Sequence, residues 1–137
     1  MIRVPRDLFN AALSVSGNSY APYSNFHVAA AVRDERGRVF AGVNVENSSY
    51  GLTMCAERVA VFNAVTQGAR GIREVLVLAL DSDEPVPPCG ACLQVLSEFG
   101  DDDTVVYMVS WKSGRIDVRR LGELLPSKFR LKGRSME

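Results

Sequence analysis

Three cysteines and one glutamate in this chain of 137 residues have a spacing that is suited to chemistry. Cys55 begins the run Cys-Ala-Glu-Arg, and Cys89 and Cys92 form a Cys-x-x-Cys pair directly after a proline. Zinc in proteins is usually tetrahedral, so three thiolate ligands would leave one position open for water or substrate. Glu57, two residues after Cys55, is placed to move the protons of that water. The spacing therefore predicts an open, catalytic zinc site.

A closed, structural zinc site is the main alternative. The fourth cysteine that such a site most often uses does not occur in the sequence. His27 would complete a Cys₃His set, but its neighbours alternate as in a strand, which favours an ordinary strand residue. Glu57 taken alone is a routine helix-surface glutamate, and beside three ligands the catalytic interpretation is the stronger one. A zinc-loaded but catalytically silent binding module remains the alternative outside the enzymes.

Helices and strands alternate along the chain and must position these residues. A first helix is expected from Pro5, with Leu8, Ala12 and Val15 on one face, and a second from a Thr53 cap to Gly68. A third is expected around Cys92, Val95, Leu96 and Phe99, and a last short one over 121–129 with an interruption at Pro126. Strands are expected at 26–32 and 38–45, joined by a turn at 34–37, and at 75–80, 105–109 and 115–118. This order predicts an α/β fold: a mixed sheet of about five strands between helices on both faces, a three-layer α-β-α arrangement.

Both helices near the motif are expected to begin at cysteines. Cys55 falls in the first turn of the second helix, and Cys89 and Cys92 fall in the first turn of the third. Helix N-termini offer partial positive charge and free backbone N–H groups, which would stabilise the thiolates. Arg58, on the same helix face as Cys55, is predicted to neutralise the sulfurs further, and an exposed helix arginine is its alternative role.

Length and composition are those of one soluble domain. We expect a single domain over residues 1–137 with a frayed basic tail at about 130–137. The formal net charge is zero, which disfavours a nucleic-acid partner, and no apolar run is long enough to span a membrane. Three cysteines without a secretory leader predict reduced thiolates and a cytoplasmic location.

Six short stretches carry a resemblance to a known family. They are residues 23–26, 42–47, 49–53, 55–58, 88–92 and 124–126. In this order they resemble the small, homotetrameric type of zinc-dependent cytidine deaminase, in which a ligand-x-Glu run precedes Pro-Cys-x-x-Cys. The resemblance implies a cytidine deaminase-like fold with one Zn²⁺ per subunit. It also implies hydrolytic deamination of cytidine and deoxycytidine to uridine and deoxyuridine, with release of ammonia, as in pyrimidine salvage.

The resemblance further implies which residues contact the nucleoside. Asn44 and Glu46, with Val45 between them, match a pair that binds the sugar hydroxyls, and residues two apart on a strand point the same way. Their alternative role is to cap the loop that follows. Phe26 matches an aromatic that packs near the pyrimidine, although taken alone it is a core residue. The backbone N–H of Ala56 would bind the base carbonyl.

Two more matches imply active sites shared between the subunits of a tetramer. Tyr50, with Ser49, matches a loop lent to a neighbouring subunit, and Phe129 matches an aromatic that covers the base from another subunit. One position departs from the family: relatives commonly carry arginine directly after the second cysteine of the pair, where this chain has Leu93. Arg58 is therefore the main side-chain cation expected near the sulfurs.

Two other deaminases compete with this interpretation. A blasticidin-type nucleoside antibiotic deaminase would use the same zinc chemistry, but residues 44–46 and Phe129 favour plain cytidine. An enzyme that edits polynucleotides is disfavoured by the neutral net charge and by the lack of a basic, aromatic-rich groove.

Overall fold

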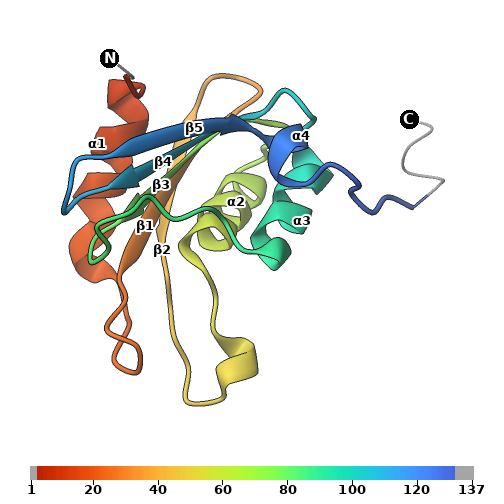
Figure 1. The fold of residues 1–137 in the computed structure, drawn as a ribbon. Helices are drawn as coiled ribbons and strands as arrows, with labels where there is room; N and C mark the ends of the chain where they lie inside the picture. Colours follow the sequence, from red (N-terminus) through yellow and green to blue (C-terminus); the bar gives the residue numbers. More distant parts are fainter. Residues whose placement is uncertain (1–2, 132–137) are drawn as a thin grey trace.

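A five-stranded sheet forms the centre of the computed structural model, which describes residues 3–131 (Figure 1). The strands are β1 (Val28–Asp34), β2 (Val39–Val43), β3 (Ile72–Ala79), β4 (Val105–Ser110) and β5 (Ile116–Arg120). Their order in the sheet is β2-β1-β3-β4-β5, and only β3 and β4 run parallel. The predicted mixed sheet is confirmed.

Helices cover both faces of this sheet. They are α1 (Arg6–Val15), α2 (Ala56–Thr66), α3 (Gly90–Phe99) and the short α4 (Leu121–Leu124), together with the 3₁₀ turns η1 (Ser16–Asn18) and η2 (Tyr50–Leu52). α1 lies on one face, whereas α2 and α3 lie side by side on the other, which confirms the three-layer prediction (Figure 1). No helix in the described part is long and apolar enough to cross a membrane.

The hydrophobic core is divided between the two faces of the sheet, because successive side chains of a strand point to opposite faces. Val28, Ala30 and Val32 of β1 and Val75 and Val77 of β3 join the cluster under α2 and α3. The residues between them, Ala29, Ala31, Leu76 and Leu78, join the cluster under α1. The central strands are therefore buried on both sides, as their continuous apolar runs predict.

The C-terminal segment differs from the expectation of a helix over 121–129. α4 ends at Leu124, and Leu125 has φ −137° and ψ 76° because the following Pro126 disfavours a helical conformation before it. The chain then runs away from the sheet (Figure 1). Arg130 donates a hydrogen bond of 2.9 Å to the carbonyl of Ser97 in α3. The rest of the predicted basic tail, residues 132–137, lies outside the described residues.

Gly42 of β2 allows α2 to approach the sheet closely. A Cβ atom at this position would lie 2.5 Å from the backbone nitrogen of Ala60 and 2.9 Å from the carbonyl oxygen of Ala56. Both distances are too short for real contacts, so any side chain would push α2 away. Because α2 begins next to Cys55 and carries Glu57, the absence of a side chain at Gly42 helps to set their position.

Gly42→Ala is expected to lower the free energy of unfolding by about 1–3 kcal/mol, as overpacking of a tight interior does. Gly17→Ala is the matched control, because a Cβ there meets no heavy atom within 4 Å. Urea unfolding of both variants measures the effect. Equal stabilities of the two variants would show that α2 does not need this close approach.

Candidate zinc centre and active site

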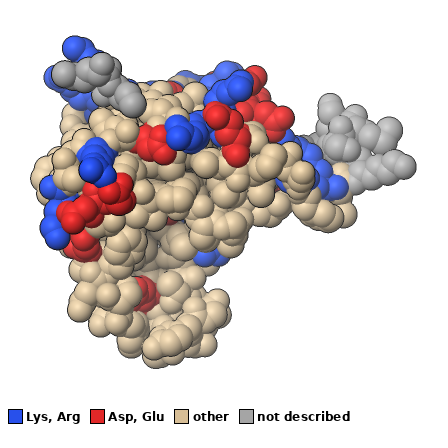
Figure 2. Space-filling model, viewed as in Figure 1, with Lys and Arg blue, Asp and Glu red and all other residues tan. Residues whose placement is uncertain are grey.

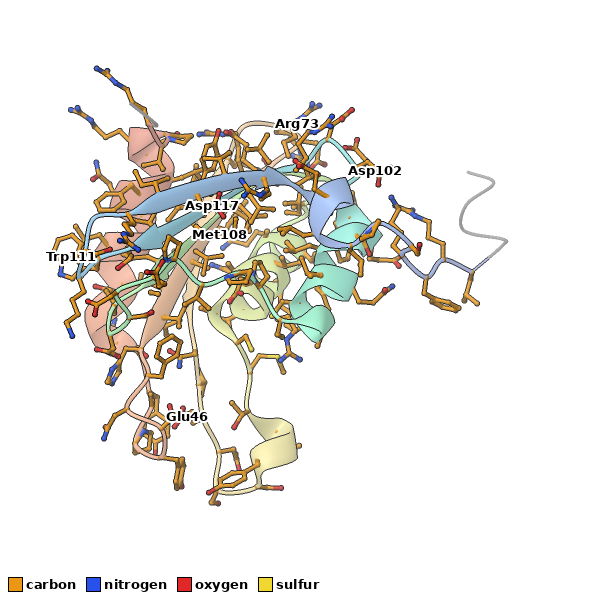
Figure 3. All side chains as sticks on the ribbon, viewed as in Figure 1. Glu46, Arg73, Asp102, Met108, Trp111 and Asp117 are labelled. Atoms are coloured by element: carbon orange, nitrogen blue, oxygen red, sulfur yellow. The ribbon has the colours of Figure 1, made fainter. Side chains whose placement is uncertain are left out.

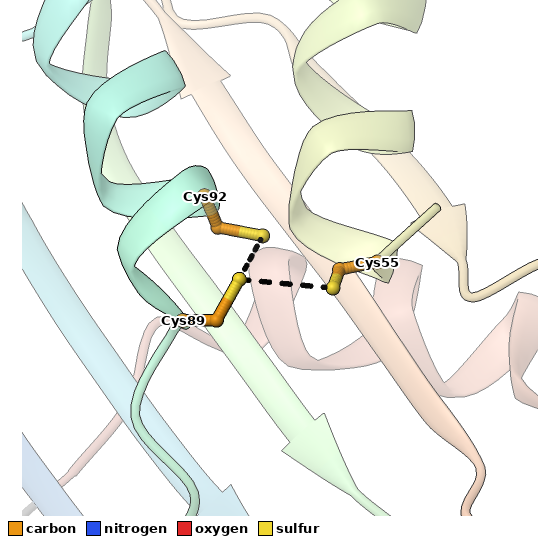
Figure 4. A group of neighbouring side chains, drawn as sticks. All are labelled: Cys55, Cys89 and Cys92. Carbon is orange, nitrogen blue, oxygen red and sulfur yellow. Dashed lines mark hydrogen bonds between the residues drawn. The ribbon is translucent and has the colours of Figure 1, made fainter. Parts of the chain in front are cut away.

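The three cysteines meet where two helices begin (Figure 4). Cys55 is the N-cap residue of α2, Cys89 is the N-cap residue of α3, and Cys92 is the third residue of α3. The sulfur of Cys89 lies 3.9 Å from that of Cys55 and 3.5 Å from that of Cys92. Cys55 and Cys89 thus stand one residue before the predicted helical turn, with extended backbones that hold their side chains in front of the helix starts.

The sulfur separations fit a tetrahedral zinc ion. Two thiolates bound at about 2.3 Å in this geometry lie about 3.8 Å apart. The three sulfurs lie within 4.8 Å of one another, and no other cysteine, histidine or carboxylate of residues 3–131 joins the group. The closed Cys₃His alternative is wrong, because His27 Nδ1 instead lies 2.8 Å from the carboxylate of Asp81. Three soft ligands with no protein fourth suit an open zinc site.

One arginine side chain lies beside these sulfurs. The Nη2 of Arg58 donates to the sulfur of Cys55 at 3.5 Å, and this contact raises the pKa of Arg58. The pKa of Cys55 falls to about 5 because the Cys92 thiol donates a hydrogen bond to it, with a further contribution from Arg58. Leu93 is buried in the core below α3 and brings no charge. Arg58 thus lies where a residue that neutralises the thiolates is expected.

Thr53 does not cap α2, contrary to the expectation. Its hydroxyl instead accepts a hydrogen bond of 3.1 Å from the backbone of Asn47, inside the loop that precedes the helix. Thr53 and Cys55 both lie just before the apolar part of α2, so the sequence pattern allows either of them as the N-cap. In the structure Cys55, with an extended backbone, takes this position.

Glu57 is the second residue of α2, and its side chain is buried beside the cysteines. Burial raises the pKa of its carboxyl to about 7, because the charged form is poorly solvated there. Both protonation states of Glu57 are therefore accessible near neutral pH. This is the property that a group needs in order to accept a proton in one step and return it in the next.

In the metal-free protein, this shift predicts that Glu57 makes folding less favourable as the pH rises. The folded state keeps a proton that the unfolded state releases, between the ordinary pKa of 4.5 and about 7. The stabilising contribution is fully present below 4.5 and is lost by about pH 7, a change of about 3 kcal/mol. Urea unfolding of wild type and Glu57→Gln at pH 5 and pH 8 measures it. A wild-type-minus-variant stability that does not fall between pH 5 and pH 8 would contradict the prediction.

A cavity of about 220 Å³ opens beside the cysteines. Four of the predicted substrate-binding residues line it together with Glu57, namely Phe26, Asn44, Glu46 and Ala56. Val45, Tyr50 and Phe129 do not line it. The sequence interpretation did not single out Ser24, Val86 and Pro87, which also form its wall. Ser24 lies in one of the matching stretches, so a signal for it existed. Val86 and Pro87 lie in the proline-rich segment before α3, and nothing in the sequence assigned that segment to the site.

The three other predicted residues lie outside this cavity. Val45 is half-exposed and pairs through its backbone with Met54. Tyr50 lies at an adjoining hollow that Tyr23, Ser24 and Glu46 also line, and its side chain is 76% exposed. Phe129 is 67% exposed on the C-terminal segment, where its carbonyl accepts a hydrogen bond from Gln94.

Asn44 has a fixed amide orientation. Its Oδ1 accepts hydrogen bonds from the backbone of Val28 at 3.1 Å and from the hydroxyl of Ser19, while its Nδ2 donates to the carbonyl of Phe26 at 2.8 Å. Both lone pairs of the oxygen are used. One N–H of the amide is left for a ligand in the cavity. The Asn44 side chain therefore binds residues that precede it in the chain, not the loop that follows as its alternative role required, and it still offers a hydrogen-bond donor.

Glu46 projects from an arm that hangs below the sheet and consists of residues 17–27 and 44–55 (Figure 3). Its carboxylate accepts hydrogen bonds from the backbone of Tyr23 at 2.9 Å and of Ser24 at 3.1 Å, and from the Ser24 hydroxyl. These bonds, that of the Ser24 hydroxyl first, lower the pKa of Glu46. Glu46 is thus an ionised acceptor at neutral pH, with lone pairs left for a ligand.

The arm carries almost no charge. Glu46 is the only acidic residue of segments 17–27 and 44–55, and neither segment contains lysine or arginine. Figure 2 shows that charged side chains gather over the upper part of the visible face and are sparse over the arm. No lysine or arginine is among the described residues that line the cavity or the adjoining hollow. The site therefore suits an uncharged ligand.

Comparisons with known proteins agree with this geometry. Residues 3–108 match the family profile of the cytidine and deoxycytidylate deaminase zinc-binding region. A cytidine deaminase of Halalkalibacterium halodurans is 45% identical over 122 residues, which cover 89% of this chain and 91% of that protein. The solved structure of cytidine deaminase from Burkholderia pseudomallei has a TM-score of 0.85 and 41% identity, and the match covers 93% of this chain and 100% of that one. A blasticidin-S deaminase of Bacillus cereus is more distant, at 29% identity over 75% of this chain and 76% of that protein.

Proposed function

This chain belongs to the zinc-dependent cytidine and deoxycytidylate deaminase family, and we propose that it hydrolyses the free nucleosides cytidine and deoxycytidine to uridine and deoxyuridine, with release of ammonia. The observation that carries the proposal is the single cavity that joins two kinds of group. Cys55, Cys89 and Glu57 line one part, and Asn44 and Glu46, which we propose bind the sugar hydroxyls, line another. A role in pyrimidine salvage follows from this reaction.

Cys55, Cys89 and Cys92 would hold the zinc ion. When bound, zinc supplies Lewis acidity, which lowers the pKa of a water molecule toward about 7. The same three thiolates donate electron density to the metal and weaken this effect. Arg58 and the two helix N-termini counteract the thiolates by drawing charge from the sulfurs.

Glu57 moves the protons. In our proposal its carboxylate accepts a proton from water and passes it to N3 of the cytosine ring, as the water oxygen adds to C4. It then carries the hydroxyl proton from C4 to the amine, the C4–N4 bond breaks, and ammonia leaves. A carboxyl with a pKa of about 7 suits both directions of transfer, and burial gives Glu57 this value.

The nucleoside is oriented by groups on both sides of Glu57. Ala56 is the first residue of α2, so its backbone N–H has no partner within the helix and is proposed to bind the base carbonyl. Asn44 offers an N–H and Glu46 offers carboxylate lone pairs, a combination that suits a sugar hydroxyl able to accept from one and donate to the other. Phe26 is proposed to pack against the base and sugar from the cavity wall.

A nucleotide or polynucleotide substrate fits this site poorly. A phosphate is normally met by arginine, lysine or a metal ion, and the cavity walls among the described residues contain no lysine or arginine. Glu46 would instead repel a phosphate placed near the sugar. These features favour the nucleoside over deoxycytidylate.

We also propose a homotetramer in the cytoplasm, with active sites shared between subunits. Tyr50 and Leu52 are largely exposed at the tip of the arm, and Phe129 is exposed on a segment that does not reach the cavity of its own chain. Aromatic side chains in such positions suit insertion into the site of a neighbour. Three thiols that must stay reduced to bind zinc suit the cytoplasm.

The test is a substrate panel. Zinc-loaded protein is incubated with cytidine, deoxycytidine, cytosine and blasticidin S, and ultraviolet absorbance and ammonia are followed. We expect turnover of both nucleosides and little of the free base, because Asn44 and Glu46 need a sugar. Faster turnover of blasticidin S would assign the chain to the competing class, and zinc-loaded protein without any turnover would support the binding-module alternative.

A further inference from the structure

Ser24 connects two walls of the cavity. Its hydroxyl donates a hydrogen bond to the Oε2 of Glu46 and accepts one of 3.0 Å from the backbone N–H of Phe26. The residue lines both the cavity and the adjoining hollow. The bond from Phe26 occupies a lone pair of the hydroxyl oxygen. Its hydrogen is therefore free to point toward Glu46.

The backbone holds this serine in a constrained turn. The N–H of Asn25 donates to the carbonyl of Ala21 at 3.0 Å, and Asn25 has a φ of +57°, the only positive φ among the described non-glycine residues. Asparagine tolerates this left-handed conformation better than most residues do. The turn reverses the chain so that two successive N–H groups, those of Tyr23 and Ser24, also face Glu46.

A second set of contacts attaches this turn to the strand that carries the sugar-binding pair. The N–H of Tyr20 donates to the carbonyl of Asn44 at 3.0 Å, and the N–H of Glu46 donates to the carbonyl of Tyr20 at 2.9 Å. The segment that bears Ser24 therefore runs beside residues 44–46 and cannot shift without moving them.

We propose that Ser24 is a positioning residue that sets the affinity of the site for the sugar by orienting the carboxylate of Glu46. This inference rests on the proposed function of the site as a nucleoside site. The two backbone N–H groups both bind Oε1, so the Ser24 hydroxyl is the only hydrogen-bond partner of Oε2 among the described residues. Because both carboxylate oxygens are held, the carboxylate of Glu46 has a fixed orientation, and its remaining lone pairs stay available to a ligand in the cavity. Without the hydroxyl, the two backbone N–H groups still hold Oε1, but Oε2 loses the contact that fixes its direction.

Ser24→Ala tests the proposal through the split between KM and kcat. We expect the KM for cytidine and deoxycytidine to rise about tenfold, the equivalent of one hydrogen bond to a charged group, while kcat changes little. Ser24→Thr keeps a hydroxyl and is expected to restore a KM close to wild type. Ser14→Ala is the matched control, because the Ser14 hydroxyl only contacts its own helix at Ala11.

A double-mutant cycle then separates orientation of Glu46 from a direct or purely structural role. In a Glu46→Ala background, Ser24→Ala is expected to cause no further loss of kcat/KM, because the group that it orients is absent. Losses that multiply would overturn the proposal, as would an unchanged KM in the single variant or a failure of threonine to restore it. A wild-type protein that turns over neither nucleoside would instead refute the proposed function, so the two failures are distinguishable.

Discussion

Glu57→Gln is expected to lower kcat by about 100- to 10,000-fold while the protein keeps its zinc. Glutamine has nearly the same shape as glutamate but cannot carry a proton between water, N3 and the leaving amine, and a general acid–base group contributes about this factor. The carboxyl is buried and is not one of the three groups of the cysteine cluster, so its replacement leaves those three sulfurs in place. Steady-state kinetics with cytidine measure the loss of kcat. Atomic emission measures the amount of zinc per chain.

The control for this variant is Glu123→Gln, because Glu123 is exposed on α4 and lies outside the cavity. It should keep full activity. The fold of the Glu57 variant is checked by its unfolding curve, which is expected to show equal or greater stability above pH 7, since an unfavourable buried charge has been removed. Full activity of Glu57→Gln would remove this residue from the mechanism.

Cys89→Ala is expected to lose zinc and, with it, all measurable turnover. The variant keeps only two of the three sulfurs in the described cluster, and the loss of one ligand is expected to weaken zinc binding by about 100- to 1,000-fold. Zinc content after dialysis against a mild chelator measures the effect. Retention of one zinc per chain by Cys89→Ala would show that the ligand set is wrong.

Ala91→Ser is the matched control for the cysteine variant. Ala91 lies between Cys89 and Cys92 at the start of α3 and is exposed, so a serine there changes the same helical turn without replacing a cysteine. It should keep its zinc and its activity. If it loses metal as readily as Cys89→Ala does, the effect belongs to the turn and not to the sulfur.

Much of this site could be predicted from the sequence because its chemistry depends on local spacing. Cys89 and Cys92 are three apart at one helix start, and Cys55 and Glu57 are two apart at another, so each half of the site follows from one short stretch. The order of helices and strands follows from apolar periodicity in the same way. The cysteine cluster that the spacing predicted is present in the structure.

The features that escaped prediction depend on contacts between distant parts of the chain. Ser24 binds Glu46 across 22 residues, and the amide of Asn44 is fixed by Ser19 across 25 residues. The periodicity of apolar residues along the chain does not predict either of these two pairings. Thr53 was misassigned as a cap for a related reason: its hydroxyl bonds back to Asn47 in the loop, and a pattern based only on the following helix does not include that partner.

The most direct test of the hydrolytic mechanism is the mass of the product formed in ¹⁸O-labelled water. If Glu57 takes the proton of the water that adds to C4, at a site where the three cysteines would hold zinc, zinc-loaded protein will convert cytidine to uridine that carries one ¹⁸O atom, with one ammonia released for each uridine. Uridine without the label, or no uridine at all from protein that holds its zinc, would contradict the account.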